Sequence, residues 1–184
     1  MKKIISLALV LALCLTFFPV MASAEESEEP VAEPIKTSIS TVEELLQFAR
    51  DVNAGKYDGK TDAVVSLDVD LDLTDVEWTP IGGENHYFVG AFDGKNHTIS
   101  NITVSSAEYA GLFGYVEGSI KNLFLDTVSI SGDVVVAGAL AGDAGGTIKN
   151  CHVTNLNMSL NVQYYAGGLI GFVEKNTSID GCSV

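Results

Sequence analysis

Ile120-Lys-Asn-Leu-Phe-Leu125 and Ile148-Lys-Asn-Cys-His-Val153 are two copies of one short phrase, and related copies begin at Ile99 and Ile179. A second, glycine-containing phrase lies between them and occurs three times, as Ala110-Gly-Leu-Phe-Gly114, Gly138-Ala-Leu-Ala-Gly142 and Gly167-Gly-Leu-Ile-Gly171. Repetition at a period of roughly 20–30 residues is typical of stacked-repeat proteins, in which each unit buries its apolar face against its neighbours. The sequence therefore predicts an all-β fold, a right-handed parallel β-helix (β-solenoid).

Alignment of the four copies places like residues in columns. The first column is Ile99, Ile120, Ile148 and Ile179; the second is Ile102, Leu123, Cys151 and Cys182; the third is Val104, Leu125, Val153 and Val184. In coils that stack as parallel strands, each column becomes an inward ladder with about 4.8 Å between steps. Positions i and i+3 cannot face the same side of a straight strand, so we expect a bend between the first two columns. The residues at that bend are Asn101, Asn122, Asn150 and Gly181, all of types that tolerate left-handed dihedral angles.

The glycine phrases predict a second face of each coil. Their central residues, Leu112, Leu140 and Leu169, are expected to point inward. We assign a structural role to Gly114, Gly142 and Gly171, because glycine permits tight corners and a close approach of neighbouring backbones. On the same alignment Asp143 lies across from Tyr115 and Phe172, so the acidic residues of the repeats do not form a row.

The N-terminal residues predict export. Lys2 and Lys3 precede an apolar run from Ile4 to Val20, and the small residues at 22–24 match a signal peptidase site. Residues 1–24 are therefore predicted to be a signal peptide, with no membrane span left after its cleavage. Residues 25–37 contain five glutamates and two prolines and are predicted to be a disordered acidic leader.

The chain is strongly acidic, with a net charge of -14. Loss of the two N-terminal lysines would make the exported chain more acidic still. Such a charge favours solubility and argues against nucleic acid or an anionic membrane as a partner. We expect a secreted or cell-surface, that is extracellular, location.

Residues 38–184 are predicted to form the β-helical domain. Ser40-Thr-Val-Glu43 has the pattern of a capping box, and apolar residues follow at helical spacing as far as Val52. We predict an N-terminal amphipathic capping helix over residues 41–54, pre-repeat strands over residues 63–98 and repeats over residues 99–184. Because Val184 falls within a repeat, we expect the last coil to be incomplete and its end to be covered by a continuation of the chain or by a partner.

Three aspartates lie on the polar side of an alternating run from Ala63 to Leu73, which predicts a half-buried strand. Asp68, Asp70 and Asp72 are weak candidates for calcium, since that ion takes hard oxygen ligands. On a strand they are about 7 Å apart, too far to converge on one ion without loop ligands. A solvated strand face is the favoured interpretation, and no other metal and no cofactor is predicted.

Cys151 and Cys182 share a column on adjacent coils, at a separation that would allow a disulfide. Both side chains leave parallel strands in the same direction, which would strain a bridge. Leu123 in the same column shows that an apolar side chain suffices there. The sequence favours buried thiols that pack as small hydrophobic groups.

The repeats resemble the GLUG motif of bacterial secreted and cell-surface proteins. The resemblance is carried by Gly111-Leu-Phe-Gly114 and Gly167-Gly-Leu-Ile-Gly171, each followed by a strand of the Ile-x-Asn type. The stretch from Val42 to Ile99 resembles the region that often precedes such motifs, although the middle repeat departs at Ala139 and Ala141. The resemblance implies a β-helical segment of a surface protein, sometimes attached to large proteases or adhesins, and it transfers no catalytic residue.

No catalytic residue is predicted, and we expect that the chain is not an enzyme. β-Helical enzymes that cleave acidic polysaccharides need clustered carboxylates, or calcium with a strongly basic side chain. Here the repeat acids are dispersed, Arg50 is on the predicted helix and the three histidines are scattered.

Aromatic residues near loops suggest a binding surface. Tyr109, Tyr164 and Tyr165 are candidates for a platform that contacts sugars or protein, although the same rings could brace the corners of the coils. The predicted function is a non-catalytic repeat scaffold for adhesion or display of a glycan- or protein-binding surface. The alternative is an accessory β-helical module of a larger secreted protease or polysaccharide-active enzyme.

Overall fold

The computed structural model describes residues 33–105 and 107–184, and all structural statements below concern those residues. The predicted signal peptide, residues 1–24, and most of the predicted leader lie outside the described residues. Within the described part of the chain, no helix is long and apolar enough to cross a membrane.

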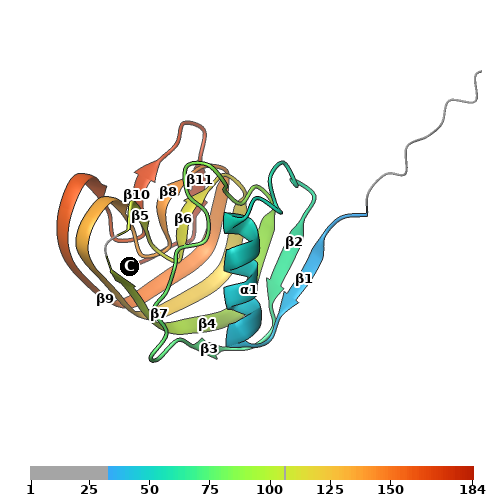
Figure 1. Cartoon of the computed structure of the whole chain (residues 1–184), viewed down its shortest axis with the longest axis horizontal. Helices are drawn as coiled ribbons and strands as arrows, with labels where there is room; N and C mark the ends of the chain where they lie inside the picture. The colour runs from blue at the N-terminus through green and yellow to red at the C-terminus, as the bar shows by residue number, and fades with distance from the viewer. Residues whose placement is uncertain (1–32, 106) are drawn as a thin grey trace, which may run out of the picture. The chain divides into compact units, whose positions relative to one another are not determined.

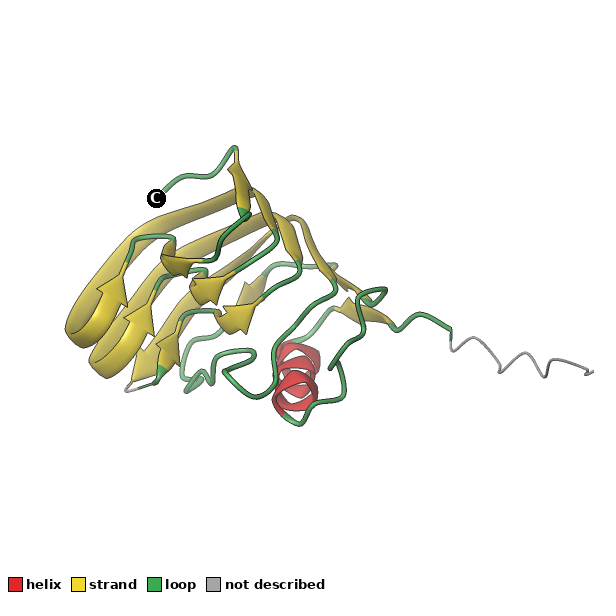
Figure 2. Ribbon diagram, turned by 90° about the horizontal axis from the view of Figure 1, so that it is seen from above, coloured by secondary structure: helices red, strands yellow, loops and turns green. Residues whose placement is uncertain are grey.

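The domain is a parallel β-solenoid, as predicted. It has about five turns. Its larger sheet follows the order β1-β2-β4-β7-β9-β11, with the short strands β3 and β5 paired to β4 and β7 (Figure 1). The strand bounds are β1 Lys36–Ile39, β2 Val64–Leu67, β3 Leu71–Asp72, β4 Ala91–Ser105, β5 Tyr109–Ala110, β7 Ser119–Ala137, β9 Thr147–Ala166 and β11 Ser178–Asp180. A second sheet has the order β10-β8-β6, with bounds β6 Phe113–Val116, β8 Ala141–Ala144 and β10 Ile170–Val173. Figure 2 shows the long, curved strands stacked side by side, with the short strands in a second row.

The predicted ladders form in the later coils. Ile120 pairs with Ile148 and Ile148 with Ile179, while Leu123 pairs with Cys151. The side chains of Ile120, Leu123 and Ile148 are fully buried. The columns of the sequence repeat are therefore inward rows in the coils of β7 and β9, whereas in the last copy Ile179 and Val184 are 45% and 64% exposed.

The first copy of the phrase occupies a different part of the coil from the one predicted. Ile99 pairs with Leu125, whereas the residue that pairs with Ile120 is Phe92. Ile102 and Val104 likewise pair with Val128 and Ile130, one face further along the coil than predicted. The cause is that the coil that contains this copy already begins at Ala91, so the predicted boundary at residue 98 cuts through the single strand β4.

Asparagines turn the chain at two different corners. Asn122 and Asn150 have φ of 53° and 51° and share one corner with Gly181, at 64°. Asn101 also bends as predicted, at φ 59°, but it lies at a second corner together with Thr127 and Asn155. In the coil of β4 the register shifts between Asp93 and His97, where Lys95 and Asn96 adopt positive φ, and β4 stays parallel to β7 on both sides of the shift.

The glycine phrases form the second face. Leu112 and Leu140 are fully buried, and Leu169 of the last coil is half-buried. A Cβ atom on Gly114 would lie 2.2 Å from the carbonyl oxygen of Gly82, so the backbones of successive coils touch here. Gly82 itself, with φ 80°, extends this glycine row one coil toward the N-terminus.

The capping helix α1 spans Val42–Asn53 and closes the core of the first coils. Phe48 packs edge-on against Phe88, with ring centroids 5.4 Å apart. The Asn53 side chain accepts a hydrogen bond from the Gly82 N–H and donates one to the Pro80 carbonyl. These bonds place α1 next to the segment that precedes the short sheet.

The predicted helix start is wrong by one residue. Thr41, not Ser40, is the N-cap, and its hydroxyl accepts from the Glu44 N–H at 3.2 Å. Glu44 reaches back to the Ser40 N–H at 2.7 Å. At the other end the helix stops at Asn53, because Gly55 adopts φ 80° directly after the C-cap Ala54.

Two further boundaries need correction. The predicted leader, residues 25–37, overlaps β1, because Lys36 and Thr37 pair in parallel with the residues of β2. The run from Ala63 to Leu73 is two strands rather than one, since the chain turns between β2 and β3 and leaves Val69 37% exposed.

Candidate functional site

The three candidate calcium ligands do not converge on one point. The Asp68 carboxylate accepts hydrogen bonds from Lys95 Nζ at 2.7 Å and from the Ser38 and Ser66 hydroxyls. The hydrogen bond from Lys95 is the main reason that the pKa of Asp68 falls to about 2.

Asp70 and Asp72 have partners of their own. The Thr98 N–H donates to Asp70 at 2.9 Å, and the Asn101 amide donates to Asp72 at 2.8 Å. Among the described residues, no group of three or more His, Cys, Asp or Glu side chains is placed to hold a metal ion. These aspartates tie successive coils together at the corners.

Two of the candidate binding aromatics, Tyr109 and Tyr165, belong to a patterned surface that is formed by the short sheet and by the adjoining strands of the larger sheet. Tyr109 pairs with Val136, which pairs with Tyr165, so these residues form one row across three coils. Tyr115, Asp143 and Phe172 form the neighbouring row, as the sequence alignment predicts. Glu117, Gly145 and Glu174 follow directly after the ends of β6, β8 and β10 and form the third. We call these nine residues the aromatic–acidic face.

The outer coils of this face carry rings, whereas the middle coil carries short side chains. On one side the rings of Tyr109 and Tyr115 stack at 6.3 Å between centroids. On the other side Tyr165 and Phe172 pack at 5.1 Å. Two strand spacings, about 9.6 Å, separate the two aromatic pairs. The middle coil contributes Val136, Asp143 and Gly145 between them, and of these Val136 and Gly145 are buried.

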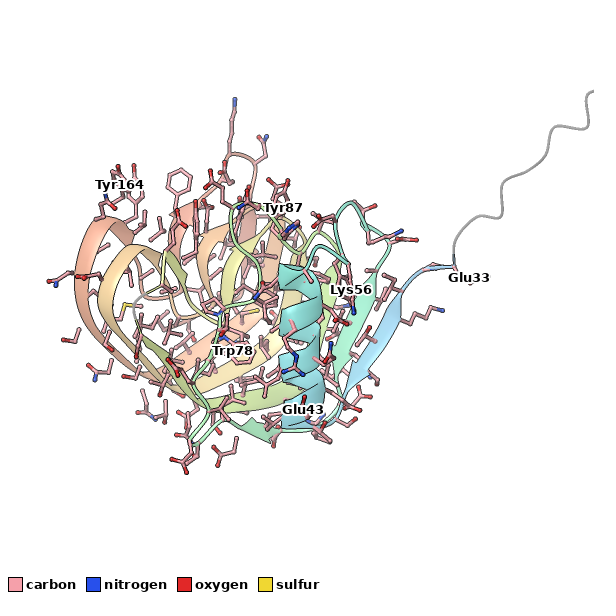
Figure 3. The ribbon with its side chains drawn as sticks, in the orientation of Figure 1. Glu33, Glu43, Lys56, Trp78, Tyr87 and Tyr164 are labelled. Carbon is pink, nitrogen blue, oxygen red and sulfur yellow. The ribbon has the colours of Figure 1, made fainter. Side chains whose placement is uncertain are left out.

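Further rings extend both pairs. Tyr87 packs on Tyr115, with centroids 4.7 Å apart, and Tyr164 packs on Tyr165 at 6.4 Å. Tyr164 is the most exposed of these rings, at 65%. Figure 3 shows Tyr87 and Tyr164 on the same upper side of the domain, away from Glu43 at the lower end of α1.

Asp143, in the middle of the face, has an unusual environment. Its Oδ1 atom is buried and has no hydrogen-bond partner. Burial, together with the nearby carboxylates of Glu174 and Glu117, raises the pKa of Asp143 to about 6. A buried carboxylate oxygen without a donor is costly, and such groups need an explanation.

The acidic side chains of the face are not neutralised within the domain. The Tyr115 hydroxyl donates to Glu117 Oε1 at 2.5 Å, and burial and this bond raise the pKa of Tyr115. Among the described residues, none of the seven ion pairs involves Glu117, Asp143 or Glu174. The face is thus both aromatic and negatively charged.

A hollow of about 330 Å³ adjoins the first aromatic pair. Tyr109, Glu108 and Glu84 contribute to its lining, together with Asn53 at the end of α1. Burial, Glu84 and Glu108 raise the pKa of Tyr109. The hollow therefore continues the aromatic and acidic character of the face toward the N-terminal end.

Cys151 and Cys182, the two cysteines within the described residues, are free thiols. Cys151 is buried, which raises its pKa to about 12, and Cys182 is half-buried. The Cys151 N–H lies 3.4 Å from the Cys182 sulfur, so the two residues are neighbours in adjacent coils. Neither lies on the aromatic–acidic face.

The sequence predicts part of this face. Tyr109, Tyr164 and Tyr165 are candidates by their positions near loops, and the glycine phrases place Asp143 between Tyr115 and Phe172. The row that joins Tyr109 to Tyr165 through Val136 is missed, because the loops between those residues differ in length from coil to coil. The exposure of Tyr164 and Tyr165, and the alternation of large and short side chains from coil to coil, appear only once the strands are paired.

Comparison with known proteins gives a limited set of similarities. No family model matches the chain. Halomucin of Haloquadratum walsbyi is 37% identical over 98 residues, which are 51% of this chain and 1% of halomucin, so the chain spans a very small part of that relative. Among solved structures, a candidate immunoglobulin A1 protease from Bacteroides ovatus superposes with a TM-score of 0.47 and 15% identity, covering 80% of this chain and 64% of that one.

Proposed function

We propose that the chain is a non-catalytic repeat scaffold of a secreted or cell-surface protein, and that the aromatic–acidic face displayed on it binds glycan. The observation that supports this most directly is the spacing of two aromatic pairs by one coil of short side chains. Aromatic rings offer flat apolar surfaces to the faces of sugar rings, and neighbouring carboxylates can accept hydrogen bonds from hydroxyl groups.

The extracellular location is supported by two observations. The first residues have the pattern of a signal peptide. The matched relative is, by its name, a mucin, although the match covers 1% of it. Membership of the GLUG-motif family is part of the same proposal and is supported by the row of touching glycines at Gly82, Gly114 and Gly142.

The test is a glycan array and a cell-wall pull-down with the purified full chain. We expect binding that is lost in the double variant Tyr164→Ala/Tyr165→Ala, which removes the most exposed rings. The matched control is Phe124→Ala, because Phe124 is also exposed but stacks on His152 on the long sheet. Absence of binding to every glycan and wall fragment, or equal loss in the control, would contradict the proposal.

A further inference from the structure

Four asparagines of the chain begin an Asn-x-Ser/Thr triplet, the pattern at which exported proteins accept N-linked sugar. The triplets are Asn96-His-Thr98, Asn101-Ile-Thr103, Asn157-Met-Ser159 and Asn176-Thr-Ser178. The pattern alone does not distinguish the four asparagines. The structure separates them, because a sugar can be attached to a folded domain only where the side-chain amide is exposed, unbonded and on a segment that a transferase can grip.

The Asn101 amide is engaged in the fold. Its Nδ2 atom donates to Asp72 Oδ1 at 2.8 Å and to the Thr74 hydroxyl at 3.1 Å. A sugar on Nδ2 would replace one of these N–H groups, and its bulk would separate Asn101 from the preceding coil. Asn101 is therefore excluded as an acceptor in the folded domain.

Asn157 is exposed, but its backbone is held in a sheet. It pairs with Ser129 of β7, and Ser159 at the end of the triplet pairs with Ser131. A transferase that acts on a folded protein has to draw the acceptor segment into its own active site. At this triplet it would have to break a strand ladder, whereas turns and loops open at little cost. We expect Asn157 to stay unmodified.

Asn96 and Asn176 lie in turns. Asn96 is in the part of β4 where the register shifts, and among the described strands none pairs with residues 94–96. Asn176 is in the turn between β10 and β11. Both residues are exposed and have left-handed backbones, with φ of 64° and 71°. A bulky group on either side chain would meet solvent rather than a neighbouring coil.

The amides of Asn96 and Asn176 are also unbonded within the fold. Among the described residues, the asparagine side chains that make hydrogen bonds are those of Asn53, Asn101, Asn122, Asn150, Asn155 and Asn161. Attachment of a sugar to Asn96 or Asn176 would therefore remove no contact that holds two coils together.

We propose that Asn96 and Asn176 accept an N-linked sugar from a lipid diphosphate-linked donor after the domain has folded. This inference rests on the extracellular location proposed above. In the transfer a bond forms between the asparagine Nδ2 and C1 of the donor sugar, and the bond from C1 to the diphosphate oxygen breaks. The lipid diphosphate leaves with that electron pair, and Nδ2 releases one proton to a base of the transferase.

The third residue of each triplet supplies the hydroxyl that completes the acceptor pattern. The Thr98 N–H donates to Asp70 at 2.9 Å, and the Ser178 N–H donates to the Gly146 carbonyl at 2.9 Å, so both triplets are anchored at this residue. Ser178 is exposed, whereas Thr98 is half-buried. The hydroxyl is easier to reach at Ser178, and we expect higher occupancy at Asn176 than at Asn96.

The test is glycopeptide mass spectrometry, with electron-transfer fragmentation, on the full chain isolated from the culture medium of its own source. Sugar is expected on Asn96 and Asn176 and is not expected on Asn101 or Asn157. Asn85 is the built-in control, because it is exposed but begins no triplet. Sugar at Asn101 or Asn157, or none at Asn96 and Asn176 in the extracellular protein, would overturn this inference and leave the proposed function standing. A chain found only inside the cells would overturn the extracellular location and this inference with it.

Variants that keep both asparagines test whether the triplet is recognised. Thr98→Val and Ser178→Ala remove the hydroxyl and should each lower occupancy at the preceding asparagine at least about tenfold. Thr98→Ser and Ser178→Thr keep the hydroxyl and should retain the sugar. In each variant the other site is the internal reference, so a defect in folding or export is recognised by loss at both sites. Unchanged occupancy without the hydroxyl would overturn the assignment.

Discussion

Asn150 donates a side-chain hydrogen bond to the Oδ1 atom of Asn122, one coil earlier, at 3.2 Å. Asn122 in turn donates to Asp93 at 3.1 Å, so three coils are joined at one corner. Both asparagines adopt left-handed backbone angles, which cost other residues about 1–2 kcal/mol. Asparagine therefore contributes to this corner in two ways. Its backbone tolerates the left-handed conformation, and its side-chain amide bonds to the neighbouring coil.

Substitution of Asn122 separates these two contributions. Asn122→Gly keeps the left-handed backbone and loses the two side-chain bonds, which should lower the free energy of unfolding by about 1–2 kcal/mol. Asn122→Ala loses the same bonds but keeps the Cβ in a left-handed conformation that alanine, without the polar side chain of asparagine, tolerates poorly, and it should cost about 1–2 kcal/mol more than Asn122→Gly. Denaturant unfolding measures both. Equal stability of the two variants would show that backbone strain contributes nothing at this corner.

The glycine row predicts a larger effect. In Gly114→Ala the new Cβ would lie 2.2 Å from the Gly82 carbonyl oxygen, and neither backbone can move without separating two coils. We expect a loss of about 3 kcal/mol or more, at the upper end of overpacking effects. Gly83→Ala is the control, because a Cβ atom at Gly83 would have no neighbouring atom within 4 Å. Thermal unfolding should show a large shift for the first variant and almost none for the second.

The sequence was sufficient to predict that the coils stack as parallel strands. It was not sufficient to predict which residues of the β4 coil pair with the later copies of the phrase. Ile120 and Ile148 are in register because their phrases are nearly identical, and equal side chains fill equal space in successive coils. The first coil uses Phe92 at that position and turns through Lys95 and Asn96, both with positive φ, so its phrase has a different length. The copy at Ile99 has the same local sequence pattern as the later copies, but it lies one face further along its coil, where Ile99 pairs with Leu125.

The candidate site was harder to predict, since it depends on distances across coils rather than along the chain. Asp143 has an ordinary setting in the sequence, between Gly142 and Ala144. Its environment is set by Tyr115, 28 positions earlier, and by Phe172, 29 positions later. Alignment of the glycine phrases predicts that Asp143 pairs with Tyr115 and Phe172. The burial of the Asp143 Oδ1 atom can be recognised only from the packed side chains.

The helix start offers a test of which residue is the cap. Thr41→Ala removes the hydroxyl that accepts from Glu44 and should cost about 1 kcal/mol. Ser40→Ala should change the stability very little through the helix, because Ser40 contributes its backbone N–H to Glu44 rather than its hydroxyl. Chemical unfolding of the two variants distinguishes them. A larger loss in Ser40→Ala would instead support the cap that the sequence pattern suggested.

The two cysteines should differ in reactivity. Burial raises the pKa of Cys151 to about 12, so very little thiolate is present near pH 8. Cys182 is half-buried at the last coil and should be alkylated first. Iodoacetamide labelling followed by peptide mass analysis should modify Cys182 in the folded protein and Cys151 only in denaturant. Rapid labelling of Cys151 in the native state would contradict the packing of this row.

Asp143 should make the domain less stable at neutral pH than at mildly acidic pH. Its pKa is raised from 3.8 to about 6 in the folded state, so the folded protein holds a proton that the unfolded chain releases between these values. The stability contributed by this group therefore increases as the pH falls from 6 to 4 and is absent above 6. Because the side chain is partly exposed, we expect an effect of about 1–2 kcal/mol.

The variant Asp143→Asn tests this directly. It should be more stable than the parent at pH 7, and the difference should disappear at about pH 3, below the unfolded-state pKa of 3.8, where the aspartate is protonated in both states. Asp126→Asn should behave in the opposite way at pH 7, because hydrogen bonds from Thr154 and Asn155 lower the pKa of Asp126. Unchanged stability at all pH values would mean that the Asp143 carboxylate is well solvated in the free protein.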